Sequence, residues 1–167
     1  RWRSGSTSTV TVNLPVLGTY SSTAPYYCSK SKRIFEEGCR VLAKKVADPN
    51  YKQNAITRSL NALALLASGR SEYLPIVRKE VQWASQFKAD SMATWWYGYV
   101  IMLLAEYKMA TGDDLGDDGL RRLALEAARG QSIVGSWGHK FALPDGRLGG
   151  YGMMNAPGVP LTIGMIL

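Results

Sequence analysis

Hydrophobic residues recur at helical spacing along most of the chain. Three stretches, at about residues 30–47, 72–87 and 119–130, carry apolar residues on one side and charged residues on the other. In the first stretch the apolar positions fall three and four residues apart: Phe35, Cys39, Leu42 and Val46. This spacing predicts three helices that each keep one side in solvent.

Two further stretches carry apolar residues on almost every side. They read "ITRSLNALALLAS" over residues 56–68 and "ATWWYGYVIMLLAEYKMAT" over residues 93–111. A helix that is apolar all round is normally buried all round. Gly69 and Gly112 end the two stretches roughly 43 residues apart, and a repeat of that length with two helices per unit is typical of stacked αα-hairpins. We therefore predict an inner layer of these two helices, covered by the three amphipathic ones.

Local signals place the ends of the remaining helices. Ser71 is positioned to cap the second amphipathic helix, and Asp117 or Asp118 to cap the third. A sixth helix is expected to begin near Val159, because Pro160 then suits its first turn.

The N-terminal residues follow a different period. Residues 7–17, "TSTVTVNLPVL", alternate between apolar and polar, which predicts a strand closed by Pro15. One strand is not stable alone, so we assign it to the end of a preceding domain, with residues 18–29 as a linker. The chain ends in the apolar run "LTIGMIL", which predicts that the helical part, residues 30–167, is truncated at its C-terminus.

A glycine-rich segment interrupts the helical pattern after residue 130. Residues 131–137, "QSIVGSW", fit the pattern Q-x-x-x-G-x-W, which resembles the QW motif of the α/α toroids of terpenoid cyclases and protein prenyltransferases. A glutamine at a helix end can donate to carbonyls that have no partner. Gly135 allows the backbone to turn close to the Trp137 indole.

Longer stretches extend this resemblance over nearly the whole chain. Segments such as "RSLNALALLASG", "GLRRLALEAARGQS" and "DGRLGGYGMMNAPGVPLTI" resemble an uncharacterised bacterial family in which a PDZ-like domain precedes such a toroid. The resemblance implies that residues 1–17 hold the last strand of the PDZ-like domain and that residues 30–167 form part of an α/α toroid. It implies a mostly α fold of stacked αα-hairpins, and no particular activity.

Composition and charge narrow the class of protein. Hydrophobic residues make up 46% of the chain and charged residues 20%, which is typical of a globular domain. The net charge is +7, but the basic residues occur in pairs on separate predicted helices, so nucleic-acid binding is not expected. The longest uncharged apolar run, residues 95–105, is too short to span a bilayer. No secretory signal is visible, and export would require one elsewhere in a full-length chain.

The glycine-rich loop is the strongest candidate for a functional site, because such sites concentrate on long loops held by a rigid scaffold. Its polar candidates are His139, Asp145, Arg147, Tyr151 and Asn155. A histidine can act as acid or base near neutral pH, an arginine can hold a carboxylate, and tyrosine and asparagine can orient a sugar-like ligand. The alternative is that these residues only form turns and fill the core.

Three aromatic residues are candidates for contacting a ligand: Trp96, Tyr99 and Trp137. Core packing is again the alternative. The acidic string at residues 114–118 lacks the D-x-D-D spacing of squalene-cyclase relatives and suits helix capping instead. His139 stands about a hundred residues from both cysteines, Cys28 and Cys39, so no metal site and no cofactor are predicted.

Two classes of function fit these observations. The first is a binding or scaffolding module whose inner face holds a peptide, a glycan or a protein partner; a PDZ-like neighbour favours it, since PDZ domains capture peptide ends. The second is an enzyme acting on a polysaccharide or an apolar substrate in the toroid cavity. An enzyme should gather several titratable side chains in one pocket. Uncovered hairpin ends would also allow self-association.

Overall fold

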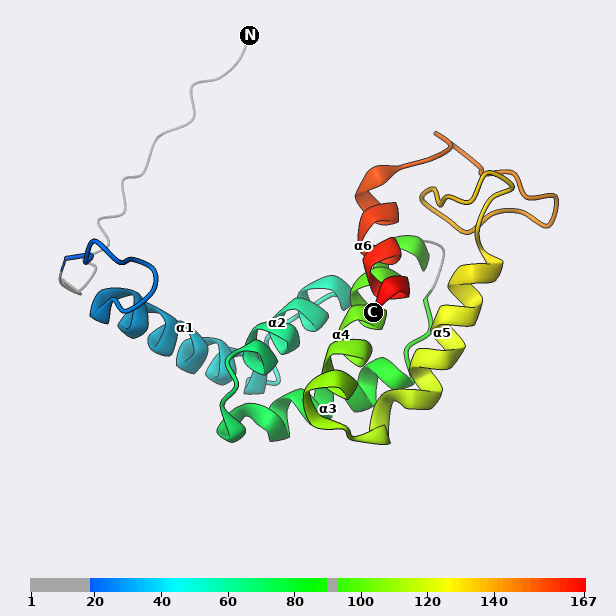
Figure 1. Cartoon of the computed structure of the whole chain (residues 1–167). Helices are drawn as coiled ribbons and strands as arrows, with labels where there is room; N and C mark the ends of the chain where they lie inside the picture. The colour runs from blue at the N-terminus through cyan, green and yellow to red at the C-terminus, as the bar shows by residue number, and fades with distance from the viewer. Residues whose placement is uncertain (1–18, 90–92) are drawn as a thin grey trace, which may run out of the picture. The chain divides into compact units, whose positions relative to one another are not determined.

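The computed structural model of the chain describes residues 19–89 and 93–167, and every regular element in these ranges is helical. The elements are α1 (Ser29–Ala47), α2 (Ala55–Ala67), η1 (Ser71–Tyr73), α3 (Leu74–Ser85), α4 (Ala93–Thr111), η2 (Asp114–Gly116), α5 (Asp117–Arg129) and α6 (Asn155–Ile166), where η marks a 3-10 helix (Figure 1). The predicted mostly α class is therefore confirmed for these residues. The strand predicted at residues 7–17 lies outside them.

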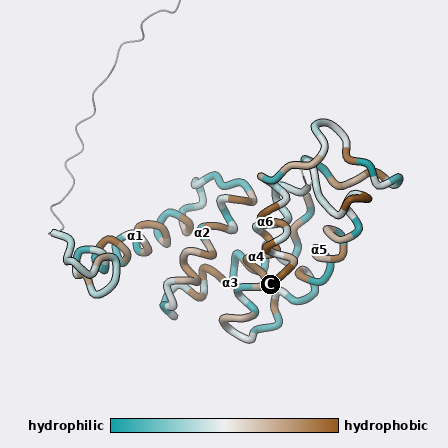
Figure 2. Tube along the Cα trace, turned by 45° about the horizontal axis from the view of Figure 1, so that its top comes forward, coloured by the Kyte–Doolittle hydropathy of each residue, from teal (hydrophilic) through white to brown (hydrophobic). Residues whose placement is uncertain are grey.

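The chain divides into two compact units, and the boundary falls inside α1, between Gly38 and Cys39. Figure 2 shows α1 alternating between hydrophobic and hydrophilic residues, as its sequence predicts. In the first unit, Phe35 on the predicted apolar side is 48% exposed. In the second unit, Cys39 is buried and Ala43 joins the hydrophobic core. Of the predicted apolar side, Cys39 is therefore buried, and Leu42 and Val46 are half-buried.

Helix α4 is the centre of the second unit. It packs against α2, α3, α5 and α6 (Figure 1). Its buried side chains cover more than half of its circumference: Tyr97, Val100, Ile101, Leu103, Leu104 and Tyr107. The prediction that residues 93–111 are buried all round is therefore correct only in part, because Tyr99, Met102 and Glu106 are half-buried on the remaining side and Met109 is 57% exposed. None of the helices in the two described ranges combines the length and apolarity that crossing a bilayer requires.

Helix α2 departs from the prediction. Its buried residues, Ser59, Ala62 and Leu65, lie on one side, whereas Leu60 is 46% exposed. The prediction that this helix is buried all round is wrong, because only the side of Ala62 and Leu65 joins the core formed with α3 and α4.

Helix α6 crosses α4 at very short distance. A Cβ atom on Gly98 would lie 2.6 Å from the Leu161 nitrogen, and one on Gly164 would lie 3.0 Å from the Gly98 oxygen. Two glycines facing each other thus bring the backbones together. On α6 the buried residues are Pro157, Leu161 and Gly164, whereas Val159, Ile163 and Ile166 are exposed.

Two predicted helix starts need correction. Helix α6 begins at Asn155 rather than near Val159, and Pro160 therefore lies inside it. Pro157 takes the place in the first turn that was predicted for Pro160, and there its missing N–H breaks no helical bond. Ser71 begins a 3-10 turn and caps no helix.

The start of α5 is also capped differently from the prediction. The carboxylate of Asp113 accepts from the amide of Leu115, 3.0 Å away, and so caps η2. Asp117 and Asp118 lie in the first turn of α5, which begins without a side-chain cap. Asp117 instead pairs with the ammonium of Lys108, 2.9 Å away.

Candidate functional site

The loop between α5 and α6 is bonded to itself in several places. The amide of Ile133 donates to the Gly146 carbonyl, and the amide of Met154 donates to the Trp137 carbonyl. Four glycines of the loop have a positive φ, which other residues rarely adopt: Gly135, Gly146, Gly150 and Gly152. The glycine-rich composition is therefore explained by a tightly folded backbone.

The scaffold fixes this loop at two points. The Thr94 hydroxyl, in the first turn of α4, reaches the carbonyl oxygens of Gly138 at 2.7 Å and His139 at 2.5 Å. The Trp137 indole donates to the Ala127 carbonyl, 2.9 Å away, near the end of α5. The loop therefore bridges the start of the central helix and the end of α5.

The Trp137 bond corrects the prediction for the motif that begins at Gln131. Gln131 was expected to satisfy free carbonyls at the helix end, but its amide reaches only the Gly135 carbonyl, 3.5 Å away within the loop. The Trp137 indole is the side chain that bonds to a carbonyl in the last turn of α5, one that also accepts from the Gly130 amide, and Trp137 is 5% exposed. The expected turn at Gly135 is confirmed by its φ of +75°.

Three aromatic side chains meet where α4 touches the loop. The Trp95 indole donates to Nδ1 of His139, 2.8 Å away, and the two rings lie within 25° of parallel. The Tyr151 ring meets the His139 ring edge-on, with centroids 5.9 Å apart. His139 and Tyr151 line a cavity of about 350 Å³ together with Lys140 and two glycines, Gly149 and Gly150.

The bond from Trp95 determines which nitrogen of His139 carries the proton. An indole N–H can only donate, so Nδ1 must accept. The neutral imidazole therefore holds its single proton on Nε2, and this N–H has no protein acceptor within the described residues. His139 is held in place as a hydrogen-bond donor.

Asp145 and Arg147 do not join this cavity. They form an ion pair at 2.7 Å inside a turn, and the Arg147 amide also donates to the Asp145 carboxylate. The amide and then the guanidinium of Arg147 lower the pKa of the Asp145 carboxyl below its ordinary value. Their role within the described loop is to hold the turn.

The remaining predicted residues are spread over other parts of the second unit. Asn155 and Trp137 line a cavity of about 190 Å³ at the start of α6. Trp96 lines a cavity of about 280 Å³ with Asn54 and Phe87. Tyr99 is half-buried on α4. Of the eight predicted residues, the structure thus brings only His139 and Tyr151 together at the aromatic cavity.

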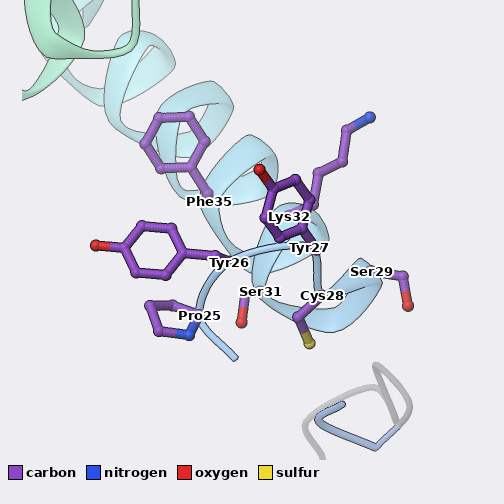
Figure 3. Close-up of a pocket in the computed structure, with 8 residues that line it drawn as sticks. All are labelled: Pro25, Tyr26, Tyr27, Cys28, Ser29, Ser31, Lys32 and Phe35. Carbon is purple, nitrogen blue, oxygen red and sulfur yellow. The ribbon is translucent and has the colours of Figure 1, made fainter. Parts of the chain in front are cut away.

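The first unit holds a cavity of about 530 Å³ that no sequence pattern predicted. Tyr26, Cys28 and Phe35 are among its lining residues, and Figure 3 shows the two rings on the same side of it. Cys28 directly precedes α1, and its Sγ accepts from the Ser21 amide at 3.4 Å. This bond, followed by one from the Ser31 amide, lowers the pKa of the Cys28 thiol to about 6. The available signal was a cysteine at a helix start.

Metal chemistry finds no support in the described residues, because no three His, Cys, Asp or Glu side chains gather there as ligands would. Both cysteines are free thiols.

Over residues 19–89 and 93–167, the regular elements are all helical, and a structured loop is attached to the central helix. The chain belongs to the family described as Domain of unknown function (DUF6288), whose model matches residues 31–167. No curated protein and no solved structure is significantly similar to the chain.

Proposed function

We propose that the chain is a ligand-binding module whose helices hold the loop at residues 130–154, and that its site is the cavity of His139 and Tyr151. One observation supports this above the others. The cavity has aromatic walls, and its histidine is fixed twice, by Trp95 at the side chain and by Thr94 at the backbone. Such preorganisation lowers the entropy cost of binding.

Binding is favoured over turnover by the residues that line the cavity. An enzyme that cleaves a polysaccharide typically places a pair of carboxylates around the reacting atom. The lining residues include no carboxylate. Asp145 is engaged with Arg147 in a separate turn, and Nδ1 of His139 is occupied by Trp95. A scaffold that holds a ligand needs none of these groups to be reactive.

We also propose that the helices form part of an α/α toroid that follows a PDZ-like domain. The packing of α4 between α2 and α6, with α3 and α5 against it, supports this arrangement. The Trp137 bond to the end of α5 supports a structural role for the QW-like motif. An experimental structure that places α2, α4 and α6 along an open line, rather than around a common axis, would contradict the toroid.

The binding proposal is tested by presenting the labelled chain to an array of glycans and an array of peptides. We expect at least one ligand whose capture is lost in Tyr151→Ala. Tyr151 is 88% exposed, so this change leaves the core intact. Tyr26→Ala is the matched control, because Tyr26 is 76% exposed and lines the cavity of the first unit. Capture that depends on Tyr26 and not on Tyr151 would move the site away from the loop.

A further inference from the structure

The cavity beside His139 offers hydrogen-bond donors and no carboxylate. Nε2 of His139 carries a proton, because Nδ1 accepts from Trp95. The amides of Gly149 and Gly150 make no backbone hydrogen bond within the described residues. Lys140 is exposed and has no ion-pair partner in the same part of the chain. Every unpaired polar group here, except the phenol and the carbonyls, can only donate.

The walls of the cavity are largely carbon. The Tyr151 ring is 88% exposed and stands at 63° to the His139 ring. Aromatic faces bury the C–H surface of a ligand, while phenol and imidazole bond to its polar rim. A volume of about 350 Å³ holds one or two sugar-sized rings and not a folded partner.

The charge around the cavity favours an anion. The negative charge nearest in sequence, on Asp145, is neutralised by Arg147. The charge of Lys140 therefore makes the cavity positive, and the chain as a whole carries a net charge of +7. Such a field raises the local concentration of negatively charged ligands.

We propose that this cavity binds an acidic sugar, a pyranose ring that bears a carboxylate. The inference rests on the binding function proposed above. The C–H face of the ring lies against Tyr151, and the carboxylate pairs with the ammonium of Lys140. Ring oxygens accept from Nε2–H of His139 and from the two glycine amides. The carboxylate and the ring oxygens would pair with the donors of the cavity, and the C–H face of the otherwise uncharged ring would pack against its apolar walls.

Two other anions fit less well. A phosphate group would match the donors, but it would leave the aromatic walls without a partner. The C-terminal carboxylate of a peptide would also match Lys140 and the amides. A peptide end lacks the flat C–H face of a sugar ring that would pack against Tyr151. Peptide binding is therefore an alternative outcome of the test below.

The test compares pairs of sugars that differ only at carbon 6. Trimers of galacturonic, glucuronic and mannuronic acid are titrated into the full chain by calorimetry, each beside the matching neutral trimer of galactose, glucose or mannose. We expect at least one uronate to bind about tenfold more tightly than its neutral counterpart, because a charge-assisted bond contributes about that factor. The difference should shrink as salt is added.

Three variants locate the binding. Lys140→Gln should weaken uronate binding about tenfold and leave the weaker neutral-sugar binding unchanged. Tyr151→Ala should weaken both kinds of sugar by about tenfold or more. Lys79→Gln is the matched control, since it removes the same charge from an exposed position on α3. The affinity of this variant for the uronate should stay within about twofold of that of the unchanged chain. Circular dichroism checks that each variant keeps its helices.

The outcomes separate this inference from the function on which it rests. Equal affinity for uronates and neutral sugars would overturn the acidic preference, and uronate binding that ignores both Lys140→Gln and Tyr151→Ala would overturn the site. If a tetrapeptide with a free C-terminus binds in a Tyr151-dependent way and no uronate binds, the acidic-sugar proposal is wrong. The proposed binding function of the cavity would then still stand. The absence of Tyr151-dependent binding on the glycan and peptide arrays as well would overturn both proposals.

Discussion

The crossing of α4 and α6 depends on Gly98 having no side chain. A methyl group at this position would lie 2.6 Å from both the Leu161 nitrogen and the Pro160 carbonyl carbon. Comfortable contact between such atoms begins near 3.5 Å. Gly98→Ala therefore requires the α6 backbone to move by about 1 Å, since backbone atoms cannot turn aside as a side chain does.

The expected cost follows from three contributions. Replacing glycine by alanine inside a helix stabilises the folded state by about 1 kcal/mol. Forcing an extra carbon into a closely packed contact costs about 1–3 kcal/mol. Moving α6 also weakens the burial of Leu161, which is fully buried and contributes about 2 kcal/mol. We expect Gly98→Ala to lower the free energy of unfolding by about 2 kcal/mol.

Gly158→Ala provides the matched control. Gly158 lies on the other helix of the same crossing, α6, and a Cβ there would meet no atom within 4 Å. The helix preference then acts alone, and this variant should gain about 0.5–1 kcal/mol. Urea unfolding followed by circular dichroism measures both values. A Gly98→Ala protein as stable as the Gly158→Ala protein would refute the close backbone crossing.

Three further predictions follow from the contacts described above. Trp137→Phe removes the indole bond to the Ala127 carbonyl, which keeps only the Gly130 amide, and should cost about 0.5–1.5 kcal/mol in urea unfolding; Gln131→Ala should stay within about 0.5 kcal/mol, and a larger loss from Gln131→Ala than from Trp137→Phe would contradict the assignment of the anchoring bond to Trp137. Arg58→Ala strands the carboxylate of Glu80, which is only 4% exposed, and should cost about 3 kcal/mol. Adding Glu80→Gln should recover part of that loss, and a double variant no more stable than the single one would show that the ion pair is not the cause. Alkylation of Cys28 by iodoacetamide, followed by mass spectrometry, should reach half its maximal rate near pH 6 instead of the ordinary 9.0. Because folding lowers this pKa, the contribution of the Cys28 thiolate to stability is complete above pH 9 and is lost as the pH falls toward 6; a half-maximal rate near 9 would contradict the bonds from Ser21 and Ser31.

The helices could be predicted closely because their signal is local. The bounds predicted for residues 93–111 coincide with those of α4, and the helix predicted near 119–130 appears at Asp117–Arg129. Hydrophobic spacing and the glycines that end two helices, Gly69 and Gly112, are local features of the sequence. Helix bounds can therefore be predicted from them without knowing how the helices pack. The start of α6 was missed because two prolines, Pro157 and Pro160, can each fill a first turn, and the spacing alone does not choose between them.

The candidate site could be predicted only as a loop. Its length and glycines identified residues 130–158, but they did not separate Tyr151, which faces a cavity with His139, from Arg147, which closes a turn with Asp145. The distinction depends on which backbone bonds the loop makes with itself, and these join residues such as Ile133 and Gly146. The toroid, the PDZ-like neighbour and the ligand class stay predictions.

The sequence by itself determined which segments are helical, because helix formation is decided by side chains three and four residues apart. It also determined that residues 93–111 would supply much of the core, since a largely apolar helix has no favourable place in water. Only the tertiary structure decided that Trp95 reaches His139 and that Arg58 reaches Glu80. These pairs lie far apart in the chain, and they meet because α2 packs against α3 and because the loop is anchored at Thr94 on α4.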